Sequence, residues 1–313
     1  MRAVLVVNPK ATGTTARMRD VLAAALAADL KVDVVTTQHR GHATEIGHEA
    51  AADGIDFVVA LGGDGTINEV VNGVLAEGHR PDLPALGIVP AGCTNVLARA
   101  LGLPTDPVEA TSVLLAGVRE GRTRLIGLGK ADDRFFTFCA GIGLDAATVR
   151  RVEQRRATTS NVTPWQYARA GFSEYFLHQS HRRPALTLSL PDAPDVAVML
   201  GLICNTAPWT YLGDRPLDPC PEASFESDLD VFALTRMYAA PTLRTLAQMF
   251  RGGPSGKRVV RHHDLSELTI TAKELAPLQV DGDFVGEVGS VTFRSVPHAL
   301  RVVIGAERES RRG

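Results

Sequence analysis

A glycine-rich turn that contains one carboxylate is the first chemical signal in the sequence. The segment Gly62-Gly63-Asp64-Gly65-Thr66 follows an apolar run at 57–61 and precedes helically spaced apolar residues at 67–75. Glycine can adopt positive φ angles and leaves backbone N–H groups accessible, so such a turn can surround a phosphate. The start of the next helix adds partial positive charge there. The alternative is a tight strand-to-helix turn in which the aspartate only caps the helix.

Asp64 adds a condition to the phosphate interpretation. Its carboxylate would repel an unscreened phosphate at the centre of the turn. A Mg²⁺ ion between the two groups removes that repulsion, because Mg²⁺ binds carboxylate, phosphate and water oxygens. The turn therefore predicts a phosphate site that works with a divalent cation.

Strands that alternate with helices predict an open parallel sheet in the first part of the chain. Strands are expected at 3–7, 32–36, 57–61 and 86–89, and helices at 16–30, 42–52, 67–75, 96–101 and 107–117. In such sheets ligands bind beyond the carboxyl ends of the strands. Glycine-bearing loops follow three of these strands, at 8–15, 62–66 and 92–95. We expect these loops to meet at one edge of the sheet.

The pattern changes near residue 122 to short strand-like segments separated by turn residues. Strands are expected at 124–129, 134–140, 185–190, 197–205, 229–234, 267–271, 278–280, 291–294 and 300–304, with helices at 144–156, 165–179 and 242–251. This pattern is typical of an antiparallel β-sandwich. The predicted organisation is an α/β nucleotide-binding domain at 1–124, a β-sandwich substrate domain at 125–306 and a frayed tail at 307–313.

Composition narrows the class of protein. The chain has 313 residues, 45% of them hydrophobic, and a formal net charge of −2, which favours a soluble globular protein without a strong overall field for nucleic acid or membranes. The four cysteines are scattered and form no Cys-x-x-Cys motif, as expected in a reducing cytoplasm. No stretch approaches the roughly 20 consecutive apolar residues of a membrane span. We therefore expect a cytoplasmic protein whose membrane contact, if any, is peripheral.

Several motifs together resemble the diacylglycerol kinase catalytic domain family, which includes bacterial diacylglycerol kinases and is related to sphingosine kinases. They follow one another along essentially the whole chain: Asn8-Pro9 with a nearby glycine, Gly62–Glu69, Pro90–Arg99, Gly141–Ala146 and Val280–Asp283. The Gly-Gly-Asp-Gly-Thr motif also occurs in NAD kinases. The segment Gly92-Cys93-Thr94-Asn95 with the following Ala98-Arg99 favours the lipid branch.

The resemblance implies a fold, an activity and cofactors. The fold is an NAD kinase-like α/β domain and a β-sandwich domain, with the active site in the cleft between them. The activity is ATP- and Mg²⁺-dependent transfer of the γ-phosphate to a lipid hydroxyl, with diacylglycerol as the leading acceptor and phosphatidic acid as its product. The implied nucleotide contacts are Asn8, Pro9, Thr12, Gly13, Thr37, Gly62, Gly63, Asp64, Gly65, Thr66, Asn68, Glu69, Gly92, Cys93 and Asn95. Asp64 is expected to act through Mg²⁺ and its waters, and Glu69 either joins that network or only favours the start of its helix.

The resemblance also implies a general base near the C-terminus. Asp281 or Asp283 would accept the proton of the lipid hydroxyl, and Asp281 is preferred. Asp283 stands where the family has glutamate, so its side chain is one methylene shorter. The alternative is that Asp281-Gly282 is only a hairpin turn, for which Asp-Gly is a strong signal.

Further departures and clusters concern the metal and the nucleotide. Cys93 replaces a family threonine and is expected to be a small buried space-filler, while Val96 replaces a common aspartate. Glu226, Asp228 and Asp230 lie where family members hold a structural Mg²⁺, although a solvated turn explains them equally well. The cluster His262-His263-Asp264 is expected to be a surface feature, since consecutive residues of a strand point to alternate faces.

Other functions stay open from the sequence. One is an NAD kinase-like or other small-molecule kinase of the same superfamily, and another is an inactive nucleotide- or lipid-binding regulator. The partners expected are ATP and a lipid alcohol at the inner membrane surface, and the sequence leaves open a homodimer with a second copy of the chain. Trp165 and 209–213 offer aromatic side chains for lipid contact or for the core, and local positive charge comes from Arg150, Arg151, Arg155, Arg156, Arg182 and Arg183.

Overall fold

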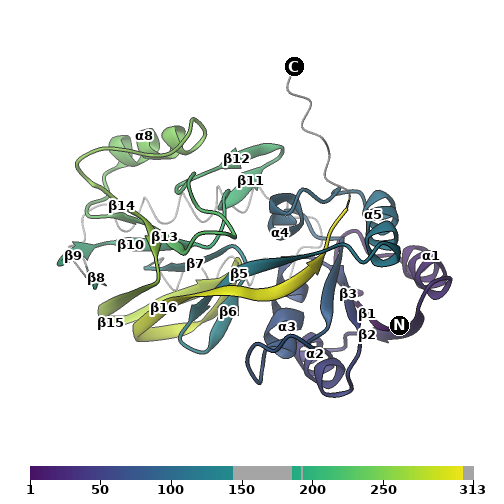
Figure 1. Cartoon of the computed structure of the whole chain (residues 1–313). Helices are drawn as coiled ribbons and strands as arrows, with labels where there is room; N and C mark the ends of the chain where they lie inside the picture. The colour runs from purple at the N-terminus through teal and green to yellow at the C-terminus, as the bar shows by residue number, and fades with distance from the viewer. Residues whose placement is uncertain (144–184, 192, 306–313) are drawn as a thin grey trace. The chain divides into compact units, whose positions relative to one another are not determined.

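A computed structural model describes residues 1–143, 185–191 and 193–305 (Figure 1). The chain forms two compact units. Unit 1 comprises Met1–Ile126 and the chain from His298 onward, and unit 2 comprises Gly127–Pro297. Several predictions lie outside the described residues: the helices at 144–156 and 165–179, Trp165, the arginines between 150 and 183, Asp145-Ala146 and the tail at 307–313.

Unit 1 is built on a parallel sheet. Its strands are β1 (Arg2–Val7), β2 (Lys31–Thr36), β3 (Phe57–Gly62) and β4 (Ala85–Pro90), in the order β2-β1-β3-β4. Strands β3 and β4 are buried along their whole length, as expected for a parallel sheet covered on both faces. The end of β16 (Asp283–Val303) extends the sheet, because Val302 pairs in parallel with Leu86 of β4.

Helices cover both faces of this sheet. Figure 1 shows α1 (Ala16–Ala27) and α5 (Pro107–Arg119) on one side, and α2 (His42–Ala52) and α3 (Asp64–Val74) on the other. Leu22 and Leu26 of α1 share one buried cluster with Leu114 and Val118 of α5 and with alternate strand residues. The short helix α4 (Val96–Ala100) follows β4. The predicted doubly covered α/β sheet is confirmed, and each helix predicted within residues 1–124 exists with small shifts at its ends.

Unit 2 is rich in antiparallel strands. They are β5 (Thr123–Ala131, which begins in unit 1), β6 (Arg134–Phe136), β7 (Cys139–Ile142), β8 (Leu186–Leu190), β9 (Ala193–Val198), β10 (Leu200–Cys204), β11 (Thr210–Leu212), β12 (Arg215–Leu217), β13 (Leu229–Leu234), β14 (Val259–Leu265), β15 (Glu267–Val280) and most of β16. One helix, α8 (Ala239–Met249), lies between β13 and β14.

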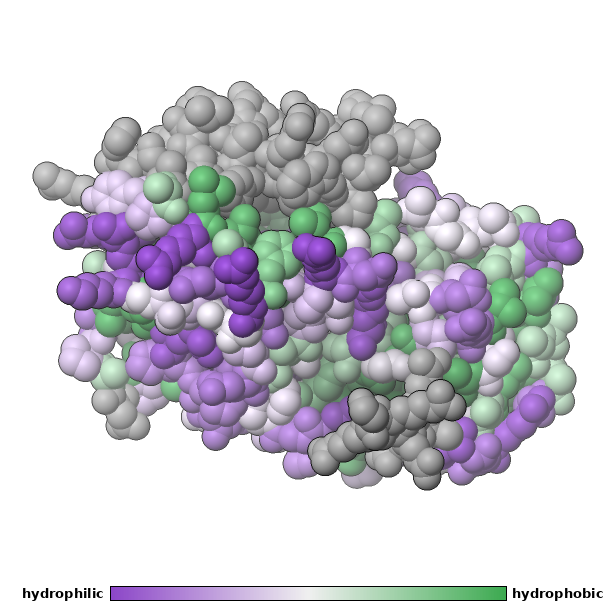
Figure 2. Space-filling model, turned by 90° about the horizontal axis from the view of Figure 1, so that it is seen from above, coloured by the Kyte–Doolittle hydropathy of each residue, from purple (hydrophilic) through white to green (hydrophobic). Residues whose placement is uncertain are grey.

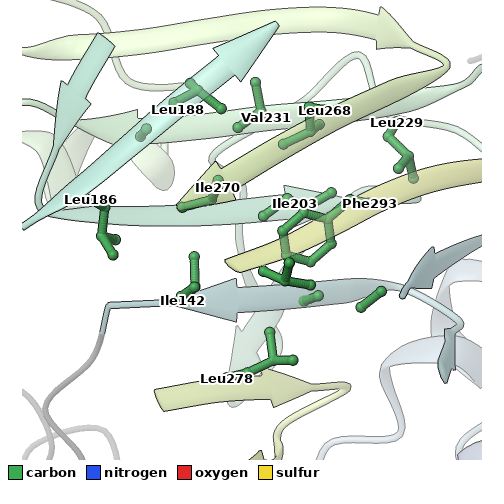
Figure 3. Close-up of a cluster of buried hydrophobic side chains, with 14 of the residues drawn as sticks. Ile142, Leu186, Leu188, Ile203, Leu229, Val231, Leu268, Ile270, Leu278 and Phe293 are labelled. Carbon is green, nitrogen blue, oxygen red and sulfur yellow. The ribbon is translucent and has the colours of Figure 1, made fainter. Parts of the chain in front are cut away.

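The long strand β15 organises the core of unit 2. Thr269–Ala272 pair with β8, whereas Leu278–Val280 pair with β7, which continues to β10, β13 and β14. Both halves of β15 contribute to one buried cluster, which Figure 3 shows with its apolar side chains gathered between strands. Sheet regions that share one core in this way make the predicted antiparallel sandwich.

The structure differs from several predicted boundaries. The predicted strand 134–140 is two strands, because Thr137 and Phe138 turn their backbone N–H groups toward a side chain, described below. Strands predicted separately at 267–271 and 278–280 are the two ends of β15. Strand β14 and the hairpin β11–β12 were not predicted. We expected the second domain to extend to residue 306, whereas the chain returns to unit 1 at His298, because β16 continues beyond β15 to reach β4.

In the part of the chain that the structure describes, no helix combines the length and the apolar character that crossing a membrane requires.

Candidate functional site

The three glycine-bearing loops of unit 1 meet at the carboxyl ends of β1, β3 and β4, as predicted. The Asn8 N–H donates to the Leu61 carbonyl at 3.0 Å, which ties the first loop to β3. The Gly13 N–H donates to the Ala91 carbonyl at 2.8 Å, and the Ala91 N–H donates to the Gly62 carbonyl at 2.8 Å. Segments far apart in the sequence therefore form one continuous rim.

A side-chain hydrogen bond joins the first loop to the start of α3. The Asn8 amide Nδ2 donates to the Thr66 hydroxyl at 2.8 Å, and its Oδ1 accepts from the Lys10 N–H at 2.9 Å. Thr66 is buried, and a Cβ at Gly62 would lie 2.7 Å from its hydroxyl oxygen. Glycine at 62 therefore leaves the space that the Thr66 side chain occupies.

The second and third loops touch backbone to backbone. A Cβ at Gly92 would lie 2.7 Å from the Gly63 Cα and 2.9 Å from the Asn95 Oδ1, closer than real Cβ atoms approach. Asn95 closes its own loop, since its Oδ1 accepts from the Gly92 N–H and its Nδ2 donates to the Gly92 carbonyl, both at 2.9 Å. Asn95 has a φ of 48°, in the left-handed region that asparagine tolerates. The third loop is thus fixed before any ligand binds.

Asp64 connects two helix N-termini. It stands in the first turn of α3, and its carboxylate accepts hydrogen bonds from the N–H groups of Val96 at 3.1 Å and Leu97 at 3.3 Å, at the start of α4. A half-buried carboxylate in the turn that also carries Thr66 offers oxygen ligands of the kind that suit Mg²⁺ shared with phosphate and water.

Asn68 and Glu69 make contacts that the sequence did not indicate. Glu69 accepts from the N–H groups of Gly41 at 2.9 Å and Ala43 at 3.3 Å, so its carboxylate caps the start of α2. Asn68 is buried, and its Oδ1 accepts from the Asn72 side chain at 3.2 Å. In these contacts both residues hold helices in place around the rim.

Cys93 is exposed, so the expectation that it fills buried space was wrong. Its Sγ lies 3.4 Å from the Thr12 hydroxyl, within hydrogen-bond range for sulfur, so the first and third loops also touch through side chains. The residue is exposed because it stands at the tip of the loop that Asn95 closes. Pro9 and Gly13 are exposed on the first loop, and Thr37 follows β2, where its N–H donates to the Val7 carbonyl at 2.8 Å.

Asp281 occupies a hairpin turn in unit 2 and is nevertheless buried. Val280 pairs with Asp283, while Asp281 and Gly282 have φ angles of 49° and 82°, as in a type I′ turn. The Asp281 Oδ2 accepts from the N–H of Thr137 at 2.8 Å and from its hydroxyl at 2.9 Å. The Oδ1 accepts from the N–H groups of Phe138 at 3.0 Å and Cys139 at 3.1 Å.

These four donors hold both oxygens of the Asp281 carboxylate in place. Burial raises the pKa of the Asp281 carboxyl above its ordinary value, and the hydrogen bonds from the Phe138, Thr137 and Cys139 N–H groups and from the Thr137 hydroxyl oppose that shift. Asp283 is only half-buried, at the start of β16. The alternatives weighed from the sequence are therefore not exclusive, because the hairpin turn also carries a specifically held carboxylate.

Two supporting residues could not be identified from the sequence. Thr137 lies 144 positions before Asp281 and supplies two of its four hydrogen bonds. Asn205 is buried, and its side-chain amide donates to the carbonyls of Gly127 and Thr137, both at 2.9 Å. Neither residue belongs to a recognisable motif, because their roles depend on strand pairing.

Within the described residues, a group with metal-ligand chemistry occurs elsewhere in unit 2. Ligand atoms of Glu222, Asp230 and His263 lie within 4.8 Å of one another, so Asp230 is the member of the predicted acidic loop that joins this group. His263 Nδ1 lies 2.7 Å from the Asp230 Oδ1. A β-bulge makes this contact possible, since His263 and Asp264 together face the single residue Asp230 in the pairing of β14 with β13.

Comparisons with known proteins agree with this architecture. The model of the diacylglycerol kinase catalytic domain matches residues 2–130. Diacylglycerol kinase from Bacillus subtilis is 36% identical over 279 residues, which cover 86% of this chain and 84% of that protein. Diacylglycerol kinase from Staphylococcus saprophyticus is 33% identical over 173 residues, so this chain spans 54% of that relative.

Solved structures show the same fold. The crystal structure of a diacylglycerol kinase from Bacillus anthracis has a TM-score of 0.69 at 18% identity and covers 97% of each chain. An NAD kinase from Archaeoglobus fulgidus in complex with ATP has a TM-score of 0.55 at 13% identity, with 98% of this chain and 95% of that chain covered. From the extent and identity of the match to the B. subtilis protein, the chain belongs to the diacylglycerol kinase family of lipid kinases, which transfer phosphate to an alcohol group.

Proposed function

We propose that the chain is an ATP- and Mg²⁺-dependent lipid kinase that phosphorylates the hydroxyl of diacylglycerol or a closely related lipid alcohol. The observation that carries the proposal is the convergence of the three loops around Gly63, Gly92 and Asn8, beside the N-terminus of α3. The names of the B. subtilis and S. saprophyticus relatives support the lipid acceptor, and the ATP complex of the A. fulgidus NAD kinase supports the nucleotide.

The rim in unit 1 is the proposed phosphate end of the ATP site. The first N–H groups of a helix have no partners within the helix, and at the start of α3 they offer donors to phosphate oxygens. The hydrogen bond from Asn8 holds the Thr66 side chain at the same helix start. Phosphoryl transfer depends mainly on such positioning and on charge neutralisation.

Mg²⁺ supplies charge neutralisation between the phosphates when it is bound. Asp64 is the proposed link to the ion, through water, since its carboxylate is half-buried and anchored by Val96 and Leu97. Anchoring at two N–H groups fixes the direction of the carboxylate, which reduces the entropy lost when the ion binds. We also propose that the acidic loop with Glu226, Asp228 and Asp230 can hold a separate, structural Mg²⁺.

The acceptor hydroxyl needs a base, and the contacts favour Asp283 over Asp281. A general base must lie within hydrogen-bond reach of the proton that it accepts, so its carboxylate must be accessible to the acceptor. Asp281 is buried and its carboxylate binds backbone N–H groups of residues 137–139, whereas Asp283 is half-exposed on the other side of the turn. We therefore assign Asp281 to hold the turn and Asp283 to accept the proton.

The second candidate is phosphorylation of NAD or another water-soluble alcohol. The likeness to the A. fulgidus NAD kinase favours it, although a match at 13% identity speaks for the fold alone. A lipid acceptor further implies peripheral contact with the inner face of the membrane, which a soluble acceptor does not require.

A transfer assay with a panel of acceptors separates the two candidates. Radiolabelled γ-phosphate of ATP is offered with Mg²⁺ to diacylglycerol, monoacylglycerol, a sphingoid base and an isoprenoid alcohol in mixed micelles, and to NAD in solution. We expect labelled product with at least one lipid and none with NAD. Turnover with NAD and no labelled lipid would replace the lipid proposal by the second candidate.

A further inference from the structure

Helix α8 in unit 2 exposes a leucine and buries two threonines. Leu243 is 53% exposed and Phe250, which follows its last residue, is 38% exposed, whereas Thr242 and Thr245 are buried. A surface helix of a globular protein normally buries its leucines and exposes its threonines. The buried hydroxyls are satisfied within the helix, where Thr242 donates to the Tyr238 carbonyl at 2.8 Å and Thr245 donates to the Pro241 carbonyl at 3.0 Å.

Helix α8 also packs apolar side chains against the rest of unit 2. Met249 is buried in an apolar cluster that also contains Phe232 and Cys220, and Leu246 packs against that cluster. The outward face then carries Leu243, Ala247 and Phe250, which are spaced four and three residues apart and so lie on one side. Tyr238, immediately before the helix, is 41% exposed as well.

The same segment carries a concentrated positive charge. Residues 236–258 contain Arg236, Arg244, Arg251, Lys257 and Arg258 and no aspartate or glutamate, although the whole chain has a net charge of −2. The Arg258 guanidinium lies 4.8 Å from the centre of the Tyr238 ring, so a cation and an outward aromatic ring stand together.

Figure 2 looks down on the side of unit 2 that carries α8 in Figure 1, where hydrophobic residues in green lie among hydrophilic residues in purple. Positive charge alone would suit any polyanion. Outward leucine and phenylalanine side chains gain free energy only where they leave water, as at the boundary between the headgroups and acyl chains of a bilayer. Positive charge together with outward apolar side chains favours a lipid surface over nucleic acid.

We propose that α8 and its flanks, residues 236–258, form a docking surface for an anionic lipid bilayer. Leu243, Phe250 and Tyr238 enter the interface, and the basic side chains meet anionic headgroups. This surface deepens the proposed function, because a lipid acceptor lies in a bilayer, but docking itself requires no turnover.

Vesicle binding of the full chain tests the surface. The probes are vesicles of phosphatidylcholine alone and of phosphatidylcholine with phosphatidylglycerol, and binding is measured by co-sedimentation. We expect the wild type to bind the anionic vesicles and to lose binding as salt rises. The double variants Leu243→Ser/Phe250→Ser and Arg244→Gln/Arg251→Gln should each bind the anionic vesicles at least about tenfold more weakly than the wild type.

Leu275→Ser is the matched control. Leu275 is 67% exposed in the same unit but lies beside both Lys273 and Glu274, so its loss should leave vesicle binding unchanged. Because all the substituted side chains are exposed, thermal unfolding should be unchanged in every variant.

Three results would overturn the docking surface. The first is equal binding of the wild type to neutral and anionic vesicles, and the second is wild-type binding by the double variants. The third is tighter binding of the wild type to a nucleic acid than to the vesicles, with nucleic-acid binding unchanged in Leu243→Ser/Phe250→Ser. A dispersed short-chain diacylglycerol tests the kinase proposal separately from docking, because this substrate needs no bilayer. On it the double variants should retain wild-type turnover. Vesicle binding by a wild-type chain that phosphorylates no lipid would support the surface and reject the kinase.

Discussion

The carboxylate of Asp281 and residue Thr137 are joined by two hydrogen bonds, at 2.8 Å from the Thr137 N–H and at 2.9 Å from its hydroxyl. The N–H groups of Phe138 and Cys139 add two more hydrogen bonds, so the carboxylate of this hairpin turn is held on both oxygens. These contacts underlie the different roles proposed for Asp281 and Asp283, which are two positions apart. Asp281 holds the backbone of the turn, and Asp283 is the proposed base.

The first prediction concerns Asp281→Asn and Asp283→Asn. An amide at 281 places N–H donors against donors, so at least two buried groups lose a partner, and the free energy of unfolding should fall by about 2–3 kcal/mol. Asp283→Asn should change stability by less than about 0.5 kcal/mol and lower kcat about 10²-fold or more, since it removes the proposed base. Urea unfolding and steady-state phosphate transfer measure the two effects.

Asp283→Glu is the control for that pair. It keeps the carboxylate and restores the length found in the family, so it should retain most of the activity. If Asp283→Asn keeps wild-type kcat while Asp281→Asn folds normally and is inactive, the roles assigned to the two residues are reversed.

The second prediction concerns the Thr66 hydroxyl. Thr66→Val removes the acceptor of the Asn8 amide and the proposed phosphate donor, so the KM for MgATP should rise about tenfold, while Thr66→Ser should stay close to wild type. Thr111→Val is matched to it, because Thr111 is also buried and its hydroxyl donates to the Pro107 carbonyl within α5. An equal rise of the KM in both valine variants would remove the assignment of Thr66 to the nucleotide.

The third prediction concerns thiol reactivity. Cys93 is exposed, whereas Cys139, Cys204 and Cys220 are buried. The hydrogen bond with Cys204 and burial raise the pKa of Cys220 well above its ordinary value, so this thiol should stay protonated and unreactive up to about pH 9.

Ellman's reagent should therefore label one thiol rapidly in the native chain, and Cys93→Ser should abolish that phase. Because Cys93 stands on the third loop of the proposed ATP site, MgATP should slow the labelling. A second fast thiol, or labelling that MgATP leaves unchanged, would disagree with the burial or with the site.

Local patterns were sufficient to predict the elements of unit 1 and the loops of the candidate site. Continuous apolar runs identified β1, β3 and β4, and the glycines marked the loops after them. The turn at Asp281-Gly282 was also predictable, because an Asp-Gly pair supplies the two positive φ angles of a type I′ turn.

The contacts that orient the side chains were not predictable, because they join residues far apart in the sequence. Asp64 reaches N–H groups 32 and 33 positions away, and Glu69 reaches N–H groups 28 and 26 positions before it. His262, His263 and Asp264 are exposed, as predicted. The contact of His263 with the buried Asp230 was not predictable, since it depends on a bulge opposite Asp230 that interrupts the alternation of the strand. Hydrogen-bond partners of this type depend on packing, which local spacing does not encode.

Gly92→Ala tests the central claim most directly, because its added Cβ would lie 2.7 Å from the Gly63 Cα and push the second and third loops apart. Gly286→Ala is the control, since nothing lies within 4 Å of a Cβ there. The measurement is transfer of labelled γ-phosphate from MgATP to diacylglycerol in mixed micelles. The account predicts labelled phosphatidic acid with the wild type and with Gly286→Ala, and at least about tenfold less with Gly92→Ala, assayed well below its own unfolding midpoint. No labelled lipid with the wild type, or full activity of Gly92→Ala, would contradict it.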